Sequence, residues 1–283
     1  MQKNHSSLIL RLMSEMQVRN YSPLTVSTYS GLLSKVENYF KLPLDQLTSD
    51  QFKGYLHRRI TEDKISVSMI NQHISAFRIL HTDILQRDWE PFKIKRPRKV
   101  KKLPVVLSIE EVERLIDSTR NIKHKTIIML AYSAGLRLQE VLSMRPSAID
   151  SSRMQVHVVQ GKGKKDRYTI LSEKVLEYLR LYYKLEKPKT YLFEPLNRKG
   201  HQISSRTLQA IVKQSCQAAG IKKKVTFHTL RHSFATHLLE KGVNLRLIQQ
   251  LLGHTSLTTT SGYLHVANIS PSGVGSPLDS MNI

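Results

Sequence analysis

Residues 228–242 read HTLRHSFATHLLEKG, a stretch whose apolar spacing predicts a helix. On a helix, positions three apart share a face, so His228 and Arg231 would direct an imidazole and a guanidinium at one point. This pair suits an anionic group that needs a proton partner and a fixed bidentate charge. The alternative is a structural histidine beside a surface arginine.

The next segment, LLGHTSLTTTSGYLHV (251–266), carries two further candidates. Gly253 is expected to end a helix, which would place His254 in a turn. Tyr263 stands among small and polar residues, a context that is unusual for a core tyrosine. An exposed surface tyrosine without a role is the alternative.

Two more features lie upstream. Arg137 follows a glycine break in AGLRLQEVLSM (134–144) and is expected at a helix start, where it could bind a phosphate. Lys162 stands between two glycines in the turn of a β-hairpin predicted for residues 154–171, where the backbone can approach another molecule. Taken singly, a surface arginine and a solvent-exposed turn lysine are the simpler explanations.

The charge of the chain points to its partner. Its 283 residues include 44 Lys and Arg against 22 Asp and Glu, a formal net charge of +22. Solubility of a small domain needs a magnitude of only about 2–8. A polyanion, most often a nucleic acid, is therefore the expected partner, although charge cannot separate DNA from RNA or binding from catalysis.

Several classes of protein are excluded. The single cysteine, Cys216, rules out a disulfide framework and a Cys-rich zinc module. The absence of a long apolar run and of a signal-peptide pattern predicts a soluble, cytoplasmic protein without a membrane partner. Common metal and phosphate-loop motifs are also absent, which favours a mechanism without a metal or cofactor.

The pattern along the chain predicts two domains and a mainly α fold with a small β-sheet. Residues 1–90 predict a four-helix domain, 91–105 a linker, 106–267 a second domain and 268–283 an extended or disordered tail. In the first domain, helices are expected over 6–18, from Ser22 and Pro23 to Phe40, from Thr48 or Ser49, and over 66–85. In the second, Ser108 and Glu111 have the spacing of a capping box.

The linker holds seven basic residues in ten, interrupted by prolines that favour extended chain. Such charges repel one another unless phosphates neutralise them, so backbone contact with DNA is favoured over a solvated spacer. The candidate DNA-binding residues are Lys93, Lys95, Arg96, Arg98, Lys99, Lys101 and Lys102.

Read in order, the candidates are Arg, Lys, His-x-x-Arg, Gly-His and Tyr. This series resembles the tyrosine recombinase (phage integrase) family, and most closely its compact Xer-type members. The resemblance covers essentially the whole chain. It implies a helical, SAM-like core-binding domain, a basic linker and an α+β catalytic domain.

The resemblance also implies a role for each candidate. Tyr263 would attack the scissile phosphodiester, leaving a 3′-phosphotyrosyl bond and a free 5′-hydroxyl. The other roles would be phosphate-oxygen binding for Arg137 and Arg231, protonation of the departing 5′-oxygen for Lys162, proton transfer with Tyr263 for His228, and a phosphate hydrogen bond for His254. The implied partners are double-stranded DNA and further copies of the chain, as a tetramer in the synaptic complex, without a cofactor.

Physical chemistry supports these roles. Phosphoryl transfer depends mostly on positioning and charge stabilisation, which guanidinium, ammonium and imidazole groups can supply in place of Mg²⁺. A tyrosyl ester conserves the energy of the broken bond, so that rejoining needs no ATP. Because tyrosine has a pKa near 10, a base or cation must assist its attack.

Two departures from the Xer pattern bear on the biological role. The tail, 268–283, is a poor helix former, so docking on a neighbouring protomer would need an extended segment. The sequence also gives no expectation of an N-terminal arm-binding domain of the kind that larger phage integrases carry. The expected reaction is integration or excision of a mobile element, slightly favoured by these departures, or resolution of DNA multimers.

The alternatives are a non-catalytic helix-turn-helix regulator, with its turn at Gly242, and an enzyme like a type IB topoisomerase.

Overall fold

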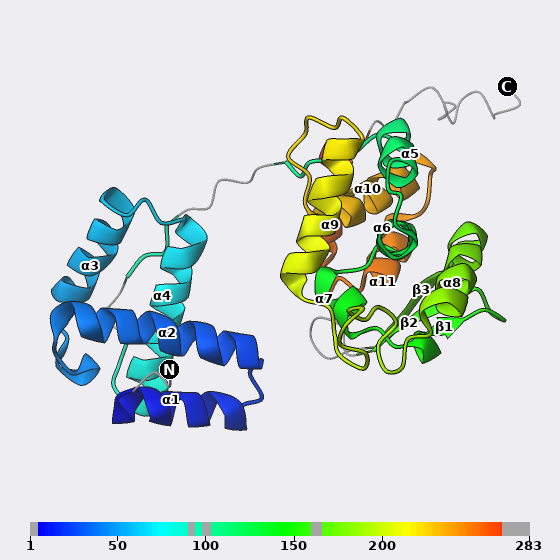
Figure 1. Cartoon of the computed structure of the whole chain (residues 1–283). Coiled ribbons are helices and arrows are strands. Elements are labelled where there is room, and N and C mark those ends of the chain that lie inside the picture. Colours follow the sequence, from blue (N-terminus) through cyan, green and yellow to red (C-terminus); the bar gives the residue numbers. More distant parts are fainter. Residues whose placement is uncertain (1–4, 90–93, 98–102, 160–165, 268–283) are drawn as a thin grey trace, which may run out of the picture. The chain divides into compact units, whose positions relative to one another are not determined.

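The computed structural model describes residues 5–89, 94–97, 103–159 and 166–267. They belong to two units, residues 1–101 and residues 102–283, called here the N-terminal unit and the C-terminal unit (Figure 1). Each unit has its own apolar core. Within the described residues, no helix has the length and apolarity needed to cross a bilayer.

The N-terminal unit consists of helices joined by short turns. Its elements are α1 (Ser7–Val18), α2 (Pro23–Phe40), the 3₁₀ turn η1 (Leu44–Gln46), α3 (Ser49–Thr61), α4 (Val67–Ile79) and the π turn η2 (Leu80–Ile84). Three helices begin at side-chain caps, because Ser22, Thr48 and Ser66 each accept a hydrogen bond from a backbone N–H three residues on. The four predicted helices are confirmed, except that the last changes to π geometry at Leu80.

The core of the N-terminal unit is built from the apolar faces of these helices. The rings of Phe52 and Phe77 stack with centroids 4.0 Å apart, and Ile9, Leu12 and Met16 of α1 are fully buried. Burial of these faces, rather than helix propensity, provides most of the stability of such helices.

Part of the predicted linker packs on the N-terminal unit. Ile94 contacts its core, and the Arg96 guanidinium donates hydrogen bonds to the Asn71 carbonyl (3.3 Å) and the Ser75 hydroxyl (2.9 Å) on α4. Lys95 is exposed. The other candidate DNA-binding residues of the linker, Lys93, Arg98, Lys99, Lys101 and Lys102, lie outside the described residues.

The C-terminal unit combines helices with a small sheet. Its helices are α5 (Ile109–Asp117), α6 (Ile122–Ser133), α7 (Leu138–Ser143), η4 (Pro146–Ala148), α8 (Glu173–Glu186), α9 (Ser205–Ala218), α10 (Phe227–Glu240), α11 (Leu245–Leu252), α12 (Leu257–Ser261) and η5 (Gly262–His265). The capping box of Ser108 and Glu111 is present at the start of α5, as predicted.

The sheet is antiparallel, in the order β1 (Ile149–Asp150), β2 (Gln155–Val158), β3 (Arg167–Ile170). Val156 pairs with Thr169 and both are buried, which sets the inner face of the sheet. The predicted hairpin is confirmed as β2 and β3. Strand β1 was not predicted, because two residues carry no periodicity.

Helix α6 lies in the middle of the C-terminal unit. Six consecutive residues, 126–131, are buried, so this helix is enclosed on all sides, and α5, α8 and α10 pack against it. Helix α11 and the turn η5 in turn contact α10. The segments around Arg137, Arg231 and Tyr263 are therefore carried by one connected group of elements.

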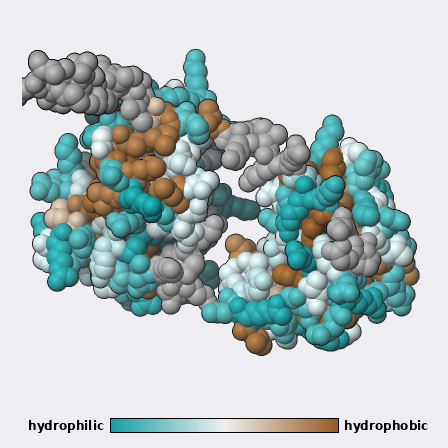
Figure 2. Space-filling view, turned by 180° about the vertical axis from the view of Figure 1, so that it is seen from behind, coloured by the Kyte–Doolittle hydropathy of each residue, from teal (hydrophilic) through white to brown (hydrophobic). Residues whose placement is uncertain are grey.

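The surfaces of the two units differ. On the face shown in Figure 2, the largest continuous hydrophobic area belongs to the C-terminal unit, whereas the N-terminal unit shows mostly hydrophilic and neutral colours.

Candidate active site

The site begins at the glycine break after α6. Gly135 has φ +60°, a conformation that favours glycine, and the chain turns there into α7. Arg137 is the N-cap of α7, as predicted, and Glu140 reaches back to it. The Glu140 carboxylate accepts hydrogen bonds from the Arg137 backbone N–H and from its guanidinium, each 2.7 Å long. This box fixes the side chain of Arg137 at the helix start.

A second arginine completes the coordination of this carboxylate. Arg167, on β3, donates from both Nη atoms to the two oxygens of Glu140, at 2.7 and 2.8 Å. Glu140 is 6% exposed. Burial alone would raise its pKa, but the hydrogen bonds and charge of Arg167, together with Arg137, lower it to about 2. The carboxylate is therefore ionised at neutral pH.

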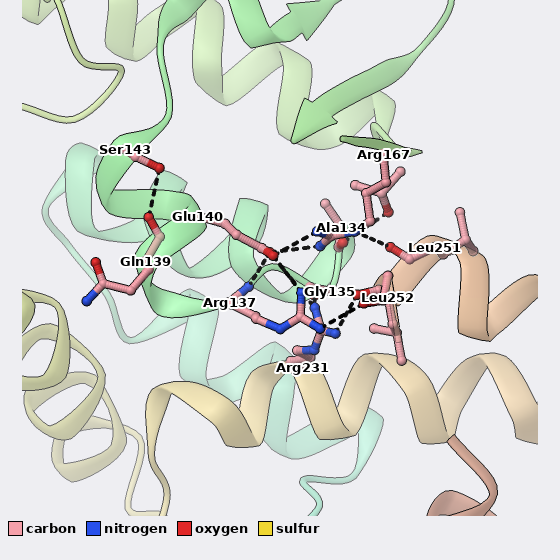
Figure 3. A network of polar contacts seen from close by, with 12 residues as sticks. Ala134, Gly135, Arg137, Gln139, Glu140, Ser143, Arg167, Arg231, Leu251 and Leu252 are labelled. Carbon is pink, nitrogen blue, oxygen red and sulfur yellow. Dashed lines mark hydrogen bonds and ion pairs between the residues drawn. The ribbon is translucent and has the colours of Figure 1, made fainter. Parts of the chain in front are cut away.

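Arg231 of α10 lies next to this pair (Figure 3). Its guanidinium donates to the carbonyl of Gly135 (2.7 Å) and to that of Leu252 (2.6 Å), and it lies 3.9 Å from Glu140. Arg231 is only 3% exposed, so the alternative of a surface arginine is wrong. Burial and the charge of Arg137 lower the pKa of Arg231, while Glu140 raises it.

The three arginines also bind one helix end. The carbonyls of Leu251, Leu252 and Gly253, at the C-terminus of α11, accept hydrogen bonds from Arg167, Arg231 and Arg137 respectively (2.8, 2.6 and 3.1 Å). Helix ends leave such carbonyls without internal partners, and the negative end of the helix dipole favours cations there. The arginines thus connect α7, β3, α10 and α11.

Charge in this cluster does not balance. Three guanidinium groups face one carboxylate, which leaves two positive charges in excess in a largely buried place. An arginine has five N–H donors, and none of these three uses all of them on described residues. The cluster can therefore bind an anion with more than one oxygen, such as a phosphodiester.

His254 follows the bound end of α11. Gly253 ends the helix with φ +61°, as predicted, and a Cβ at this position would lie 2.7 Å from Cδ of Arg167. The His254 Nδ1 lies 2.9 Å from the Thr260 hydroxyl. Burial, and then the charges of Arg231 and Arg137, lower the pKa of His254 to about 3. The ring is neutral at neutral pH and can donate or accept one proton.

Tyr263, in η5, is 4% exposed, so it is not a surface tyrosine. Its ring lies nearly parallel to that of His254, with centroids 6.4 Å apart. Its hydroxyl lies 3.1 Å from Nδ1 of His232. Burial raises the pKa of Tyr263, whereas the charges of Arg231 and Arg137 lower it.

His228 occupies the turn of α10 before His232, with ring centroids 6.5 Å apart. It is exposed and makes no hydrogen bond to any residue that the structure describes. Partial enclosure of its ring and the charges of Arg231 and Arg137 lower its pKa. Lys162 lies in the segment 160–165, outside the described residues.

The structure thus brings together five of the six candidates, and it adds three residues that sequence reasoning missed. These are Glu140, Arg167 and His232. His232 could have been found, because it is four residues after His228 and therefore on the same helix face. Glu140 stands at the capping-box spacing from Arg137, but nothing local signals Arg167. Among the described residues, no cluster of three or more His, Cys, Asp and Glu side chains could hold a metal.

Comparisons with known proteins agree with this geometry. The model of the phage integrase family matches residues 106–269, and that of the phage integrase N-terminal SAM-like domain matches residues 8–91. A tyrosine recombinase of Thermosipho africanus is 36% identical over 89% of this chain and 92% of its own length. XerD of Oceanobacillus iheyensis is 34% identical over 88% and 89%, respectively.

Solved structures show the same fold. XerH, bound to its palindromic difH substrate after cleavage, matches with a TM-score of 0.69 and 24% identity, covering 95% of this chain and 85% of XerH. A lambda integrase tetramer on a Holliday junction matches with a TM-score of 0.70 and 20% identity, covering 92% and 78%.

These matches also decide between the alternatives. Helices α10 and α11 do flank a turn at Gly242, but a helix-turn-helix regulator would not explain family matches over both units or the buried Tyr263. A topoisomerase-like enzyme is disfavoured by relatives that are recombinases along nearly the whole chain. The chain belongs to the phage integrase family and is a tyrosine site-specific recombinase of the Xer type.

Proposed function

We propose that this recombinase cleaves double-stranded DNA by attack of the Tyr263 hydroxyl, forming a 3′-phosphotyrosyl bond and releasing a 5′-hydroxyl. One observation carries the proposal. The buried arginine cluster carries two positive charges in excess, and the charges of Arg231 and Arg137 act on the hydroxyl of the buried Tyr263 by lowering its pKa. A phosphodiester bound by the cluster would supply the missing negative charge close to the Tyr263 hydroxyl, which is the proposed nucleophile.

In this proposal, Arg137 and Arg231 bind the non-bridging oxygens of the scissile phosphate. Their guanidinium groups are held by Glu140 and by the carbonyls of residues 135, 252 and 253, so little reorganisation is needed when charge develops. Arg167, which is bidentate to Glu140, fixes the carboxylate that orients Arg137.

Three more residues would complete the chemistry. His254 hydrogen-bonds the phosphate, an assignment supported by its stacking beside Tyr263 and by the nearby charges of Arg231 and Arg137, which lower its pKa. His228, exposed and without a described partner, is free to meet the DNA and to assist proton transfer. Lys162, by resemblance to the family, protonates the departing 5′-oxygen.

We also propose how the chain engages DNA. Residues 1–90 would serve as the core-binding domain, 106–267 as the catalytic domain and 91–105 as a basic linker on the phosphate backbone, followed by the tail, 268–283. Four copies would assemble on two sites. Support comes from the net charge of +22 and from the relatives named above, XerH on its substrate and the lambda integrase tetramer on a Holliday junction. The reaction would integrate or excise a mobile element or resolve DNA multimers.

A covalent-adduct assay tests the proposed chemistry. A duplex is first selected for binding to Tyr263→Phe from a random-sequence pool, and is then nicked at successive positions so that cleavage releases a short fragment and traps the enzyme. We expect a protease-sensitive protein–DNA adduct with the wild-type chain in EDTA, and none with Tyr263→Phe at equal DNA binding. An adduct with Tyr263→Phe would refute the nucleophile, and an adduct lost only in EDTA would indicate a metal enzyme.

The same adduct separates the remaining alternatives. A regulator would form none under any condition. Once adduct formation is established, two differently labelled duplexes are used to detect strand exchange. A recombinase exchanges strands between the duplexes, whereas a topoisomerase that only relaxes supercoils does not. We expect exchanged products from paired sites.

A further inference from the structure

The hydroxyl of Tyr263 has a histidine partner that is not among the six candidate residues predicted from the sequence. Nδ1 of His232 lies 3.1 Å from the hydroxyl oxygen, within hydrogen-bond distance. The two rings have centroids 5.7 Å apart. His228, to which resemblance assigns proton transfer, lies one helical turn away and makes no hydrogen bond to this hydroxyl.

We infer that His232 is a catalytic residue: it accepts the proton of the Tyr263 hydroxyl at cleavage and returns it at rejoining. This inference rests on the proposed attack by Tyr263. In this inference His232, and not His228, exchanges the proton directly with Tyr263. His228 would contact the phosphate from the exposed side of the site.

The surroundings anchor the helix on both sides of His232 and bury the ring of Tyr263. On α10, the neighbours of His232 are anchored on both sides, since Arg231 donates to two carbonyls and the Ser233 hydroxyl accepts the N–H of Leu107 (2.9 Å). The ring of Tyr263 belongs to a small apolar cluster with Phe234, Ile248 and Leu252, among others. A hydrogen bond between two fixed side chains is the arrangement that proton transfer requires.

The other histidine next to the tyrosine is already engaged. Nδ1 of His254 lies 2.9 Å from the Thr260 hydroxyl, and the ring of His254 stacks beside Tyr263 without a hydrogen bond to its oxygen. Among the described residues, His232 is therefore the one whose ring nitrogen meets the nucleophile.

Electrostatics suit a base at this place. Burial, and then the nearby His228 and Arg231, lower the pKa of His232 to about 4. The imidazole is therefore neutral at neutral pH, and Nδ1 can accept a proton. Binding of a phosphodiester brings negative charge close to the ring, which favours the protonated form and raises its pKa as attack begins.

The step balances without a co-reactant. The bond from the Tyr263 oxygen to phosphorus forms, the bond from phosphorus to the 5′-oxygen breaks, and the tyrosine proton moves to Nδ1 of His232. The departing 5′-oxygen takes a separate proton, by resemblance from Lys162. Rejoining reverses every transfer, and the proton on His232 returns to the leaving tyrosine oxygen.

The decisive variant is His232→Asn, because an asparagine amide overlaps the position of Nδ1 and can still accept a hydrogen bond but cannot take up a proton. Single-turnover cleavage is measured on the nicked duplex described above. General-base catalysis typically contributes 10²–10⁴-fold, so we expect a loss of roughly a hundredfold or more at unchanged DNA binding. His265→Gln, an exposed histidine two residues after Tyr263, is the matched control and should cleave like the wild type.

Two chemical rescues separate a base from a positioning residue. 3-Fluorotyrosine at position 263 lowers the pKa of the phenol, so it should restore much of the rate lost in His232→Asn. A sulfur in place of the 5′-bridging oxygen needs no proton to depart, so it should rescue Lys162→Ala but not His232→Asn. Cleavage by His232→Asn close to the wild-type rate, faster cleavage, or rescue by sulfur alone would each overturn the inference.

Failure of the inference can be told from failure of the proposed function. If the wild type forms the adduct and Tyr263→Phe does not, the nucleophile stands whatever His232→Asn does. A circular dichroism melt of His232→Asn checks that its fold is intact, and loss of DNA binding by this variant would count against a specific role.

Discussion

The two units bury different kinds of side chain. Among the described residues of the N-terminal unit the buried polar ones are Ser30, His73 and His81, and ion pairs such as that of Arg58 and Glu62 lie at the surface. The C-terminal unit buries formal charges, including Glu140 and Arg231. Because burial of a charge is costly even when it is paired, this buried cluster supports the proposal that cleavage takes place in the C-terminal unit.

A comparison within the C-terminal unit sharpens this point. Glu194 is also buried, but one of its oxygens accepts hydrogen bonds from three backbone N–H groups of residues 189–191, which hold this carboxylate in place as a structural anchor. Glu140 instead faces guanidinium groups that outnumber it. An excess of charge, and not burial alone, distinguishes the cluster that we propose to bind the phosphate.

The largest effect is expected from Glu140→Ala, which removes the only carboxylate of the cluster among the described residues. Breaking a buried ion pair typically costs about 3–5 kcal/mol, so the C-terminal unit should lose that stability and the enzyme should lose cleavage. Urea unfolding followed by circular dichroism reports both units. Fluorescence of Trp89, the single tryptophan, reports the N-terminal unit and should not change.

The matched control is Glu62→Ala, which breaks an exposed pair of the N-terminal unit. Neither midpoint should move measurably, because exposed pairs contribute little. Equal effects of the two substitutions would contradict the contrast between the units.

A smaller effect is expected from Gly135→Ala. The new Cβ would overlap the buried ring of Phe234, and φ at this position is +60°. Overpacking and the left-handed backbone together should cost about 2–4 kcal/mol and displace the carbonyl that holds Arg231.

Gly220→Ala provides the control, since Gly220 has φ +65° but nothing within 4 Å of the added Cβ. Only the backbone cost of about 1 kcal/mol is expected, with cleavage retained. If the two variants unfold at the same urea concentration, overlap with Phe234 does not lower the free energy of unfolding, and this prediction is wrong.

The pH dependence of stability should be next in size. The pKa of His254 is lowered to about 3 and that of His232 to about 4, whereas the unfolded value is about 6.5. Below pH 6.5 the unfolded chain takes up protons that the folded chain refuses, so stability falls as the pH is lowered. Each group contributes at most about 1.4 kcal/mol per pH unit, less because both are partly exposed.

Unfolding at pH 7.5, 6.0 and 5.0 measures this slope by circular dichroism. His254→Asn should flatten the dependence of the stability of the C-terminal unit on pH. The N-terminal unit has its own pH response, because burial lowers the pKa values of His73 and His81, and this response, followed by Trp89 fluorescence, should not change. An unaltered slope would show that His254 does not titrate as described.

The smallest effect concerns the linker. Replacing Lys99, Lys101 and Lys102 with alanine should reduce the slope of log binding constant against log salt by roughly 0.9 for each phosphate that the protein no longer neutralises. Arg96→Ala, which removes a guanidinium held by α4, should change the slope less. An unchanged slope in the triple variant would make the linker a spacer.

Much of the fold followed from local signals. The caps at Ser22, Thr48, Ser66 and Ser108 begin helices as predicted, and the glycines before Arg137 and His254 end them. Such signals act through hydrogen bonds and backbone conformations a few residues apart, so they can be recognised without knowledge of the fold.

The composition of the site needed more than that. The hydrogen-bonded partners lie far apart in the sequence. Arg167 and Glu140 are separated by 27 residues, Arg231 and Gly135 by 96, and Arg137 and Gly253 by 116. No periodicity records these pairs. Strand β1 was missed for a related reason, since its two residues are held by pairing with β2 and not by any pattern of their own.

The sequence by itself indicated six candidate residues, and it placed five of them, Arg137, His228, Arg231, His254 and Tyr263, on the helices and turns where the structure has them. Only the tertiary structure decided that His232, and not His228, lies within hydrogen-bond distance of the Tyr263 hydroxyl, and that three arginines share one carboxylate and one helix end. The physical reason is that positions such as 228 and 232 are equivalent by helical spacing. Packing of η5 against α10 then breaks that equivalence.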